Sequence, residues 1–486
     1  MTSAVATEVH SDGPTRVGII ASGVHIPYWR LRRATVDAAY GRPAGRGSRA
    51  VAGPDEDTTT MAVEAARRAV RATGADPAIG AVLLATSTPA YVDKTNATAV
   101  HAALLLPPDV HAADVGGAVR SGVAALLAGL YRPGRTLVAL ADVRTGAGSG
   151  ADEIGSGDAA AALVVGSAEP GALRAEFLGS GAASAEFLDR WRSPGEPWSS
   201  SWEERFGERE YTRLAALSLE GALKSTGLAA GDIGRIAITG LAPRAAKGFL
   251  ARSGVATEAV LPDVSGVIGY TGTAHAGIAL AALLDAAEPG QVLALTVLAD
   301  GADTLLFRAT ENVRVPDTLA AQIARGTGDV SYVDFLSWRG LLTRQQPRRP
   351  APDRAAAPPS LRRADWKFAF VGSRCTECDT RHLPPQRVCL RCGATDRMVA
   401  QPLADALGTV ATYTVDHLAF SLAPPVVAAV IDFDGGGRYS CELTDLGAVE
   451  PAVGSRVEMT FRRISSADGV HNYFWKARPA SSEGER

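Results

Sequence analysis

Four cysteines in the C-terminal part of the chain have the spacing of a metal site. Cys375, Cys378, Cys389 and Cys392 form the pattern C-x2-C-x10-C-x2-C, in which two tight turns close on one tetrahedral zinc ion. All four coordination positions would be filled by protein ligands, which describes a structural zinc without an open position for substrate. A set of disulfides is not expected in a chain that lacks an export signal. The spacing therefore predicts a zinc ribbon.

The remaining cysteine and the composition limit the chemistry of the rest of the chain. Cys441 is expected to be a buried strand residue, and no cysteine occurs in the first 374 of 486 residues. The 49 basic and 52 acidic residues leave a net charge of -3, which argues against a general affinity for nucleic acid or anionic membranes. No apolar run is long enough to span a bilayer. We therefore expect a soluble, cytoplasmic protein.

A segment rich in proline and arginine divides the chain. Residues 344–363 hold six Arg and five Pro without apolar periodicity, which predicts an extended linker. We predict a flexible lead-in over 1–15, a large domain over 16–343, a zinc ribbon over 364–400 and a small domain over 401–480.

The large domain alternates buried-type strands with Ala-rich helices, which is typical of α/β proteins. Strands are expected over 81–86, 136–142, 160–166, 235–240 and 292–300, and helices over 58–72, 94–106, 120–131, 209–226 and 274–286. The order of helix, Pro-Gly turn, buried strand and Asp-containing turn occurs twice. This repeat indicates a duplication in which two equivalent helices meet at the centre.

The small domain continues beyond the ribbon with short strands separated by glycines. They are expected over 408–415, 425–433, 438–445 and 456–463. Such strands predict a small OB-like β-barrel.

Five segments of the large domain are similar to those of a known superfamily. They are IPYWRL (26–31), GPDEDTTTMAVEAA (53–66), GSGDAAAALVVG (155–166), DRWRSPGEPW (189–198) and WEERF (202–206). Through them the chain resembles the thiolase superfamily, specifically 3-hydroxy-3-methylglutaryl-CoA (HMG-CoA) synthase and ketoacyl-acyl-carrier-protein synthase III. The C-terminal part resembles the zinc-ribbon plus OB-fold proteins that accompany these enzymes in acyl-CoA complexes. The resemblance implies a duplicated, five-layer αβαβα fold followed by the ribbon and barrel.

The resemblance also shows which catalytic residues are replaced. Family chemistry needs a cysteine at a helix N-terminus that attacks an acyl thioester, together with His and Asn or Glu. In this chain the Cys position holds Val119, the His position Leu241, the Asn position Tyr270 and the general-base Glu position Ser87. A valine cannot form a thioester, so the ordinary Claisen condensation is not expected of this chain alone.

Other residues could form a rebuilt site. His275 lies near a helix N-terminus, where a neutral imidazole could act as a base, although a single histidine is more often packed or hydrogen bonded. Tyr270 and Ser121 could join it, but their spacing forms no recognised triad. Lys247 stands where family members place a lysine that faces a CoA phosphate, and it is equally well explained as a solvated helix residue.

Two functions remain open, and whether the chain alone is an enzyme is undecided. In the first, it is a diverged subunit of an acyl-CoA-dependent acyltransferase (Claisen-type C-acylation) system. It would form a homodimer through the thiolase-type interface and would act as scaffold and CoA- or acyl-handling partner of a thiolase-fold chain that carries the cysteine.

In the second, the chain is a stand-alone enzyme with a rebuilt site. It would perform non-covalent acyl transfer or cyclisation on a substrate linked to CoA or an acyl carrier protein, with His275 or Tyr270 as acid or base. The expected cofactors are structural zinc and CoA or acyl-CoA. Binding of nucleic acid by the ribbon and barrel is the weakest alternative, because the region lacks interleaved basic and aromatic residues.

Overall fold

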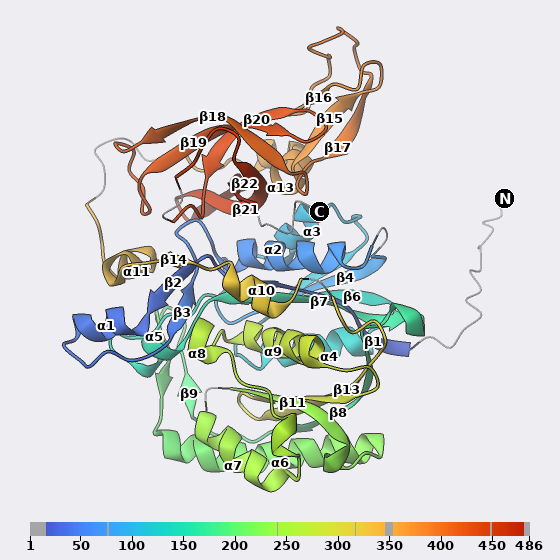
Figure 1. Ribbon diagram of the computed structural model, residues 1–486, viewed down its shortest axis with the longest axis vertical. Coiled ribbons are helices and arrows are strands. Elements are labelled where there is room, and N and C mark those ends of the chain that lie inside the picture. Colours follow the sequence, from blue (N-terminus) through green and yellow to red (C-terminus); the bar gives the residue numbers. More distant parts are fainter. Residues whose placement is uncertain are drawn as a thin grey trace, which may run out of the picture.

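Five alternating layers of helices and sheet make up the larger part of the molecule, and a barrel with a projecting ribbon lies against one outer helical layer (Figure 1). The computed structural model describes residues 16–74, 77–240, 242–315, 317–345, 353–447 and 450–480. The predicted lead-in over 1–15 lies outside these ranges. The αβαβα arrangement with a C-terminal ribbon and barrel confirms the predicted fold class.

The three helical layers contain the five predicted helices. The layer beside the barrel holds α2 (Thr58–Arg71) and α3 (Ala97–Ala103), the central layer α4 (Ser121–Tyr131) and α9 (Thr273–Ala286), and the far layer α6 (Glu204–Thr226) and α7 (Pro243–Ser253). A capping box starts α2, because the Asp57 carboxylate accepts from the Thr60 backbone N–H and the Thr60 hydroxyl oxygen accepts from the Asp57 backbone N–H, both at 2.9 Å.

The sheet between these layers consists of two halves joined at one crossing. Its strand order is β11-β12-β13-β8-β1-β7-β6-β4-β5. The strands are β1 (Arg16–His25), β4 (Ile79–Thr86), β5 (His111–Gly116), β6 (Arg135–Asp142), β7 (Ala159–Ala168), β8 (Ala175–Ala183), β11 (Ile233–Gly240), β12 (Val292–Leu298) and β13 (Ala302–Ala309). The halves meet where Gly18 and Ile19 of β1 pair with β8. A Cβ on Gly18 would lie 2.2 Å from the Ala175 carbonyl oxygen, so the crossing requires glycine.

The two central helices pack against each other, as the sequence repeat predicted. Glycines allow this close approach, because a Cβ on Gly122 of α4 would lie 2.8 Å from the Thr273 carbonyl oxygen of α9. A Cβ on Gly277 of α9 would lie 2.6 Å from the Ala161 side chain of β7. The N-termini of α4 and α9 are therefore brought together at the ends of the first-half strands.

The C-terminal part of the chain forms the ribbon and the barrel. The ribbon strands are β15 (Val371–Cys375), β16 (Arg381–His382) and β17 (Met398–Pro402), and the closed barrel has the order β18 (Gly408–Asp416), β19 (Val426–Phe433), β20 (Arg438–Leu443), β22 (Val470–Pro479) and β21 (Arg456–Ala467). Strand β22 was not predicted from the sequence. Within the predicted linker, residues 357–362 form a short helix, α12 (Ala357–Arg362).

A buried network of charged side chains joins the barrel to the segment before α2. Arg462 of β21 is fully buried, and its guanidinium lies 2.5 Å from both the Glu56 and the Asp445 carboxylates. Lys476 of β22 pairs with Asp55 at 3.0 Å. Burial raises the pKa of Glu56, but the Arg462 charge and the His25 hydrogen bond more than offset this effect and bring it to about 2. The barrel is therefore held against the layered part by paired charges.

We predict that Arg462→Met lowers the free energy of unfolding by roughly 3–5 kcal/mol, because Glu56 and Asp445 would stay buried without their partner. Urea denaturation followed by tryptophan fluorescence measures this loss. Arg438→Met is the matched control, since Arg438 is an exposed barrel residue paired with Asp432, and it should leave the unfolding midpoint nearly unchanged. Equal effects of the two substitutions would contradict the role of the network.

Candidate functional site

Three of the positions predicted to be catalytic lie where β4 and β6 end and the central helices begin. Val119 lies in the turn before α4 and packs partly buried against the central core. Ser87 follows β4 directly, and Tyr270 lies just before α9. Leu241 lies outside the described residues. At the position predicted for the nucleophile, the chain thus carries an aliphatic side chain.

The buried Asp142 carboxylate is hydrogen bonded to Ser87, the position predicted for the general base. Asp142, the last residue of β6, is fully buried and accepts hydrogen bonds from the Ser87 backbone N–H at 2.7 Å and the Ser87 hydroxyl at 2.9 Å. It also accepts from the Thr86 hydroxyl at 3.0 Å and the Thr273 backbone N–H at 2.8 Å. The Ser87 hydroxyl is a donor in this network and offers no carboxylate that could take a proton from substrate carbon.

His275 and Tyr270 are brought together, as the sequence analysis expected, but both are firmly bonded or buried. Their ring centroids are 4.8 Å apart. Nδ1 of His275 accepts from the Thr271 backbone N–H at 3.2 Å, and Nε2 lies 3.1 Å from the Asp263 carboxylate. Nε2 therefore carries the hydrogen and donates a hydrogen bond to the Asp263 carboxylate. Burial raises the pKa of Tyr270 to about 12.

In the part of the chain that the structure describes, the other two predicted site residues are not hydrogen bonded to this pair. Ser121 starts α4 and donates to the Gly116 carbonyl oxygen at 2.9 Å. Lys247 is exposed on α7, in the far helical layer. Within the described ranges neither residue is hydrogen bonded to Tyr270 or His275, so their proposed roles remain predictions.

Two arginines that were not predicted to be site residues flank this site. Arg192 donates to the Ser87 carbonyl oxygen. Arg144 is 6% exposed, and a Cβ on Gly272 would lie 3.1 Å from its Cδ atom and 2.1 Å from the Asp142 carboxylate. Burial and the charge of Arg144 lower the pKa of Arg192. The available signal was the position of Arg144 directly beyond a buried strand, where α/β proteins place site residues.

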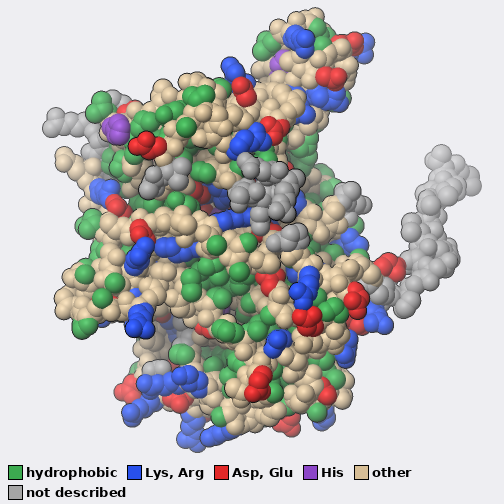
Figure 2. Space-filling model, viewed as in Figure 1, with side chains coloured by type: hydrophobic (Ala, Val, Ile, Leu, Met, Phe, Trp, Pro, Cys, Tyr) green, Lys and Arg blue, Asp and Glu red, His purple; other side chains and the backbone are tan. Residues whose placement is uncertain are grey.

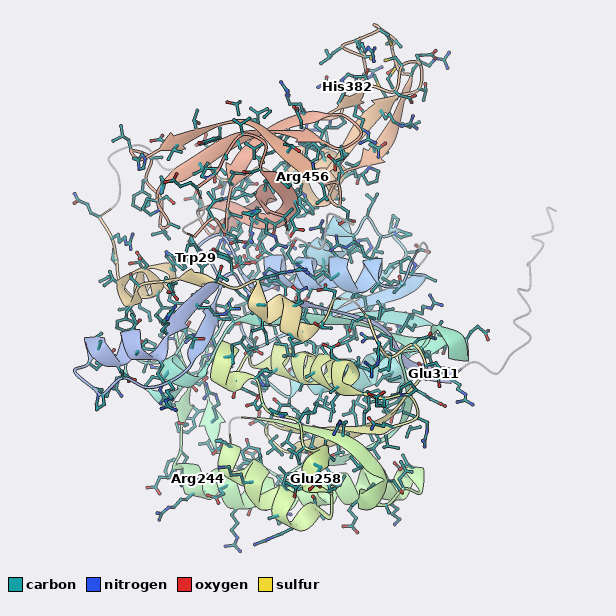
Figure 3. All side chains as sticks on the ribbon, in the orientation of Figure 1. Trp29, Arg244, Glu258, Glu311, His382 and Arg456 are labelled. Atoms are coloured by element: carbon teal, nitrogen blue, oxygen red, sulfur yellow. The ribbon has the colours of Figure 1, made fainter. Side chains whose placement is uncertain are left out.

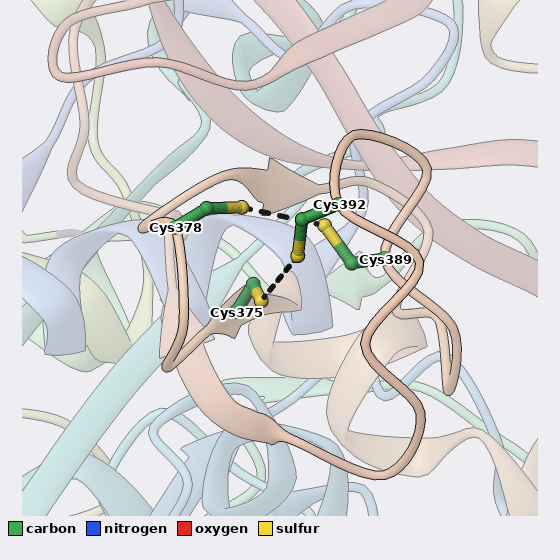
Figure 4. Close-up of side chains that lie close together, drawn as sticks. All are labelled: Cys375, Cys378, Cys389 and Cys392. Carbon is green, nitrogen blue, oxygen red and sulfur yellow. Dashed lines mark hydrogen bonds between the residues drawn. The ribbon is translucent and has the colours of Figure 1, made fainter.

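The four ribbon cysteines form a cluster that fits a tetrahedral metal (Figure 4). All four sulfurs lie within 4.8 Å of one another, with 3.7 Å between Cys375 and Cys392 and 3.5 Å between Cys378 and Cys389. Zinc–sulfur bonds of about 2.3 Å in a tetrahedron place the sulfurs about 3.8 Å apart. The donor set and spacing therefore support a structural zinc. Cys441 lies partly buried in β20, and burial raises its pKa to about 12.

A groove of about 1170 Å³ separates the barrel from the layered part. Trp29 and Trp338 line it on one side, and Tyr413 and Phe420 of the barrel on the other. Trp29 lies at this boundary in Figure 3. Since Val119 and Tyr270 do not line the groove, it is separate from the positions predicted to be catalytic. On the face shown in Figure 2, acidic and basic side chains are interspersed.

Comparisons with known proteins agree with this architecture. The chain matches the family models of the ChsH2 rubredoxin-like zinc ribbon domain over residues 368–396 and the ChsH2 C-terminal OB-fold domain over residues 400–462. Hydroxymethylglutaryl-CoA synthase of Methanothermobacter thermautotrophicus is 30% identical over 334 residues, which cover 65% of this chain and 96% of that protein. The enzyme of Methanopyrus kandleri is 30% identical over 342 residues, which cover 66% of this chain and 95% of that protein.

Solved structures show the same fold. MvaS in complex with 3-hydroxy-3-methylglutaryl coenzyme A superposes with a TM-score of 0.56 at 22% identity and covers 71% of this chain and 96% of its own. The 3-oxoacyl-[acyl-carrier-protein] synthase III of Aquifex aeolicus superposes with a TM-score of 0.52 at 20% identity. The match covers 61% of this chain and 100% of that chain. The chain is thus a thiolase-fold protein with a zinc ribbon and an OB-fold domain. It belongs to the hydroxymethylglutaryl-CoA synthase family.

Helices long and apolar enough to cross a membrane are absent from the part of the chain that the structure describes.

We predict that the purified protein contains equimolar zinc and that Cys389→Ser loses it, because three thiolates hold the ion less tightly than four. Metal analysis and limited proteolysis of residues 370–395 measure the two effects. Cys441→Ser is the matched control and should keep both the zinc and the protease resistance. A Cys389→Ser protein that retained equimolar zinc would contradict the assignment.

Proposed function

We propose that this chain is a subunit of an acyl-CoA-dependent acyltransferase that forms carbon–carbon bonds, and that a separate thiolase-fold chain supplies the nucleophilic cysteine. The observation that carries this proposal is the absence of cysteine before Cys375, together with Val119 at the start of α4. Covalent acyl transfer through a thioester needs a thiolate at that place, and the ribbon thiolates are already gathered around one point.

The altered neighbours of Val119 support the same conclusion. At the position proposed for the general-base Glu, this chain has Ser87, whose hydroxyl donates a hydrogen bond to the Asp142 carboxylate. At the position proposed for the Asn, this chain has Tyr270, a buried side chain whose phenol has a raised pKa. Restoring the cysteine alone would therefore not restore the condensation.

The exposed edge of the sheet supports a homodimer as the scaffold. Strand β5 ends the strand order, and among the described strands it pairs only with β4. Its free backbone groups are available to a second copy of the same strand across a twofold axis. A scaffold of this kind would present two ribbons at fixed positions.

The ribbon offers a surface for the catalytic partner. It projects from the barrel (Figure 1), and its second knuckle exposes 82% of Leu390. Because the buried network around Arg462 holds the barrel against the layers, a chain bound at the ribbon would keep a constant position relative to the synthase-like part. We propose the thiolase-fold chain as this partner.

Acyl-CoA or an acyl carrier protein is the proposed source of the acyl group. A solved HMG-CoA synthase is described as complexed with CoA, with a TM-score of 0.58 at 18% identity, covering 66% of this chain and 89% of its own. The curacin pathway HMG synthase is described in complex with holo donor-ACP. It superposes with a TM-score of 0.55 at 17% identity, and the match covers 67% of this chain and 88% of that chain. Lys247 remains the proposed contact to a CoA phosphate.

One observation favours the alternative of a stand-alone enzyme with a rebuilt site. His275 and the partly exposed Asp263 form a hydrogen-bonded pair beside the Tyr270 ring, and an imidazole paired with a carboxylate can act as a general base. The occupied Nδ1 of His275 weighs against it.

We predict that labelled acetyl-CoA leaves no acyl group on this chain, because no thiolate lies at the α4 terminus. Intact-mass analysis of the chain alone and of the chain with its thiolase-fold partner checks this, and the label should appear on the partner's cysteine. Turnover by the isolated chain that is lost in His275→Ala but retained in Val119→Ala would favour the alternative. A covalent acyl group on residues 16–345 would contradict both.

A further inference from the structure

We infer that the groove between the barrel and the layered part binds an extended segment of a partner protein that is rich in arginine and proline. The groove is separate from the positions predicted to be catalytic, so this binding does not depend on the proposed acyl transfer. Its volume of about 1170 Å³ exceeds that of most pockets for small ligands, roughly 300–1,000 Å³. A groove of this size suits an extended chain.

Aromatic side chains from both domains line the groove. Trp29 and Trp338 belong to the layered part and pack edge to face, with ring centroids 5.3 Å apart. Tyr413 and Phe420 belong to the barrel, and Phe420 is 45% exposed. Among the described residues, no Lys or Arg lies over any of these four rings. Proline rings pack against such surfaces, and guanidinium groups stack on them.

The groove carries an excess of negative charge. In the part of the chain that the structure describes, six acidic side chains line it, against three that are Lys or Arg. Each of the three cations already pairs with a carboxylate: Arg344 with Asp334, Arg463 with Asp57, and Lys476 with Asp55 and Glu442. The phosphates of CoA would therefore be repelled here, whereas the guanidinium groups of a partner would be attracted.

The carboxylates are also more accessible than the cations. The side chains of Asp329 and Glu442 are 57% and 49% exposed, whereas that of Lys476 is 13% exposed. Glu450 is exposed and makes no ion pair within the described ranges. An approaching segment therefore meets the acidic groups first.

One wall of the groove includes an unpaired strand edge. Strand β14 (Gly328–Asp329) pairs only with β2 (Trp29–Arg32) among the described strands. The backbone N–H groups on either side of Asp329 donate toward β2, at 3.3 and 3.0 Å. The N–H and C=O groups of Asp329 itself therefore point away from β2. Since Asp329 lines the groove, its backbone can bond an extended segment that lies there.

The two walls of the groove are fastened to each other. The Trp338 indole N–H donates to the Leu422 carbonyl oxygen of the barrel at 2.8 Å. From the barrel, the Arg463 guanidinium donates to the Pro54 carbonyl oxygen at 3.2 Å. The groove is thus preformed, which lowers the cost of ordering the site when a segment binds.

A segment in the polyproline-II conformation matches these features. Its turn of three residues places every third side chain on the same edge. Arg-Pro-Pro repeats would therefore direct the guanidinium groups toward the carboxylates and the prolines toward the aromatic rings. The carbonyl groups of such a segment are free to accept from the Asp329 backbone N–H.

Fluorescence anisotropy of the full chain with a labelled peptide of Arg-Pro-Pro repeats tests the inference. We expect this peptide to bind at least about tenfold more tightly than a peptide of Gln-Pro-Pro repeats, since several exposed ion pairs together contribute on this scale. Added salt should weaken the binding. Phe420→Ala and Glu450→Gln should each weaken it about threefold.

Val92→Ala and Glu311→Gln are the matched controls, because they alter exposed residues that do not line the groove. Both should leave the affinity for the Arg-Pro-Pro peptide unchanged. All four substitutions are at exposed positions, so unchanged melting temperatures should accompany them and show that the variants are folded.

Equal affinity for the Arg and Gln peptides, or binding that both groove variants leave unchanged, would overturn the inference. Equal binding of a peptide of Arg-Gly-Gly repeats would show attraction by charge alone and would overturn it as well. Displacement of the peptide by acetyl-CoA would assign the groove to CoA, and an oligomer that dissociates in Phe420→Ala would assign it to a second copy of the chain. Either result would contradict a peptide-binding groove.

Discussion

The carboxylate of Asp142 is the interaction on which the central part of the molecule depends. It is fully buried and accepts hydrogen bonds from Thr86 and Ser87 in the first half and from Thr273 in the second. A charge at that depth is tolerated only when such bonds satisfy it. The end of β4, the end of β6 and the start of α9 are therefore held in one arrangement. The positions of Ser87 and Tyr270 follow from it.

This arrangement explains how the fold is held together in a chain that has no cysteine before Cys375. Asp142, Arg49 with Asp158, and Arg462 with Glu56 are buried charges that have partners, and their role is to hold layers, halves and barrel together. None of these interactions needs a thiolate at position 119. Arg144 differs because its Nη2 atom has no hydrogen-bond partner among the described residues.

The sequence predicted those features that arise from local spacing. The cysteine pairs predicted the sulfur cluster because each pair lies in one tight turn, and the apolar runs predicted the inner strands because both faces of the sheet are covered. Strand β22 was missed, since residues 470–479 mix polar and aromatic side chains without an apolar run. The partners of Arg462 could not be predicted, because Glu56 is 406 residues away in sequence and becomes a neighbour only when the barrel docks.

The measurement that tests the central claim most directly is acyl transfer from a panel of short acyl-CoAs. It compares the isolated chain with the chain mixed with its thiolase-fold partner. The account predicts carbon–carbon bond formation only in the mixture, abolished when the partner's nucleophilic cysteine is replaced by alanine. Acyl transfer by the isolated chain at a comparable rate would contradict it, and would show that the residues around Tyr270 catalyse the reaction without a thioester.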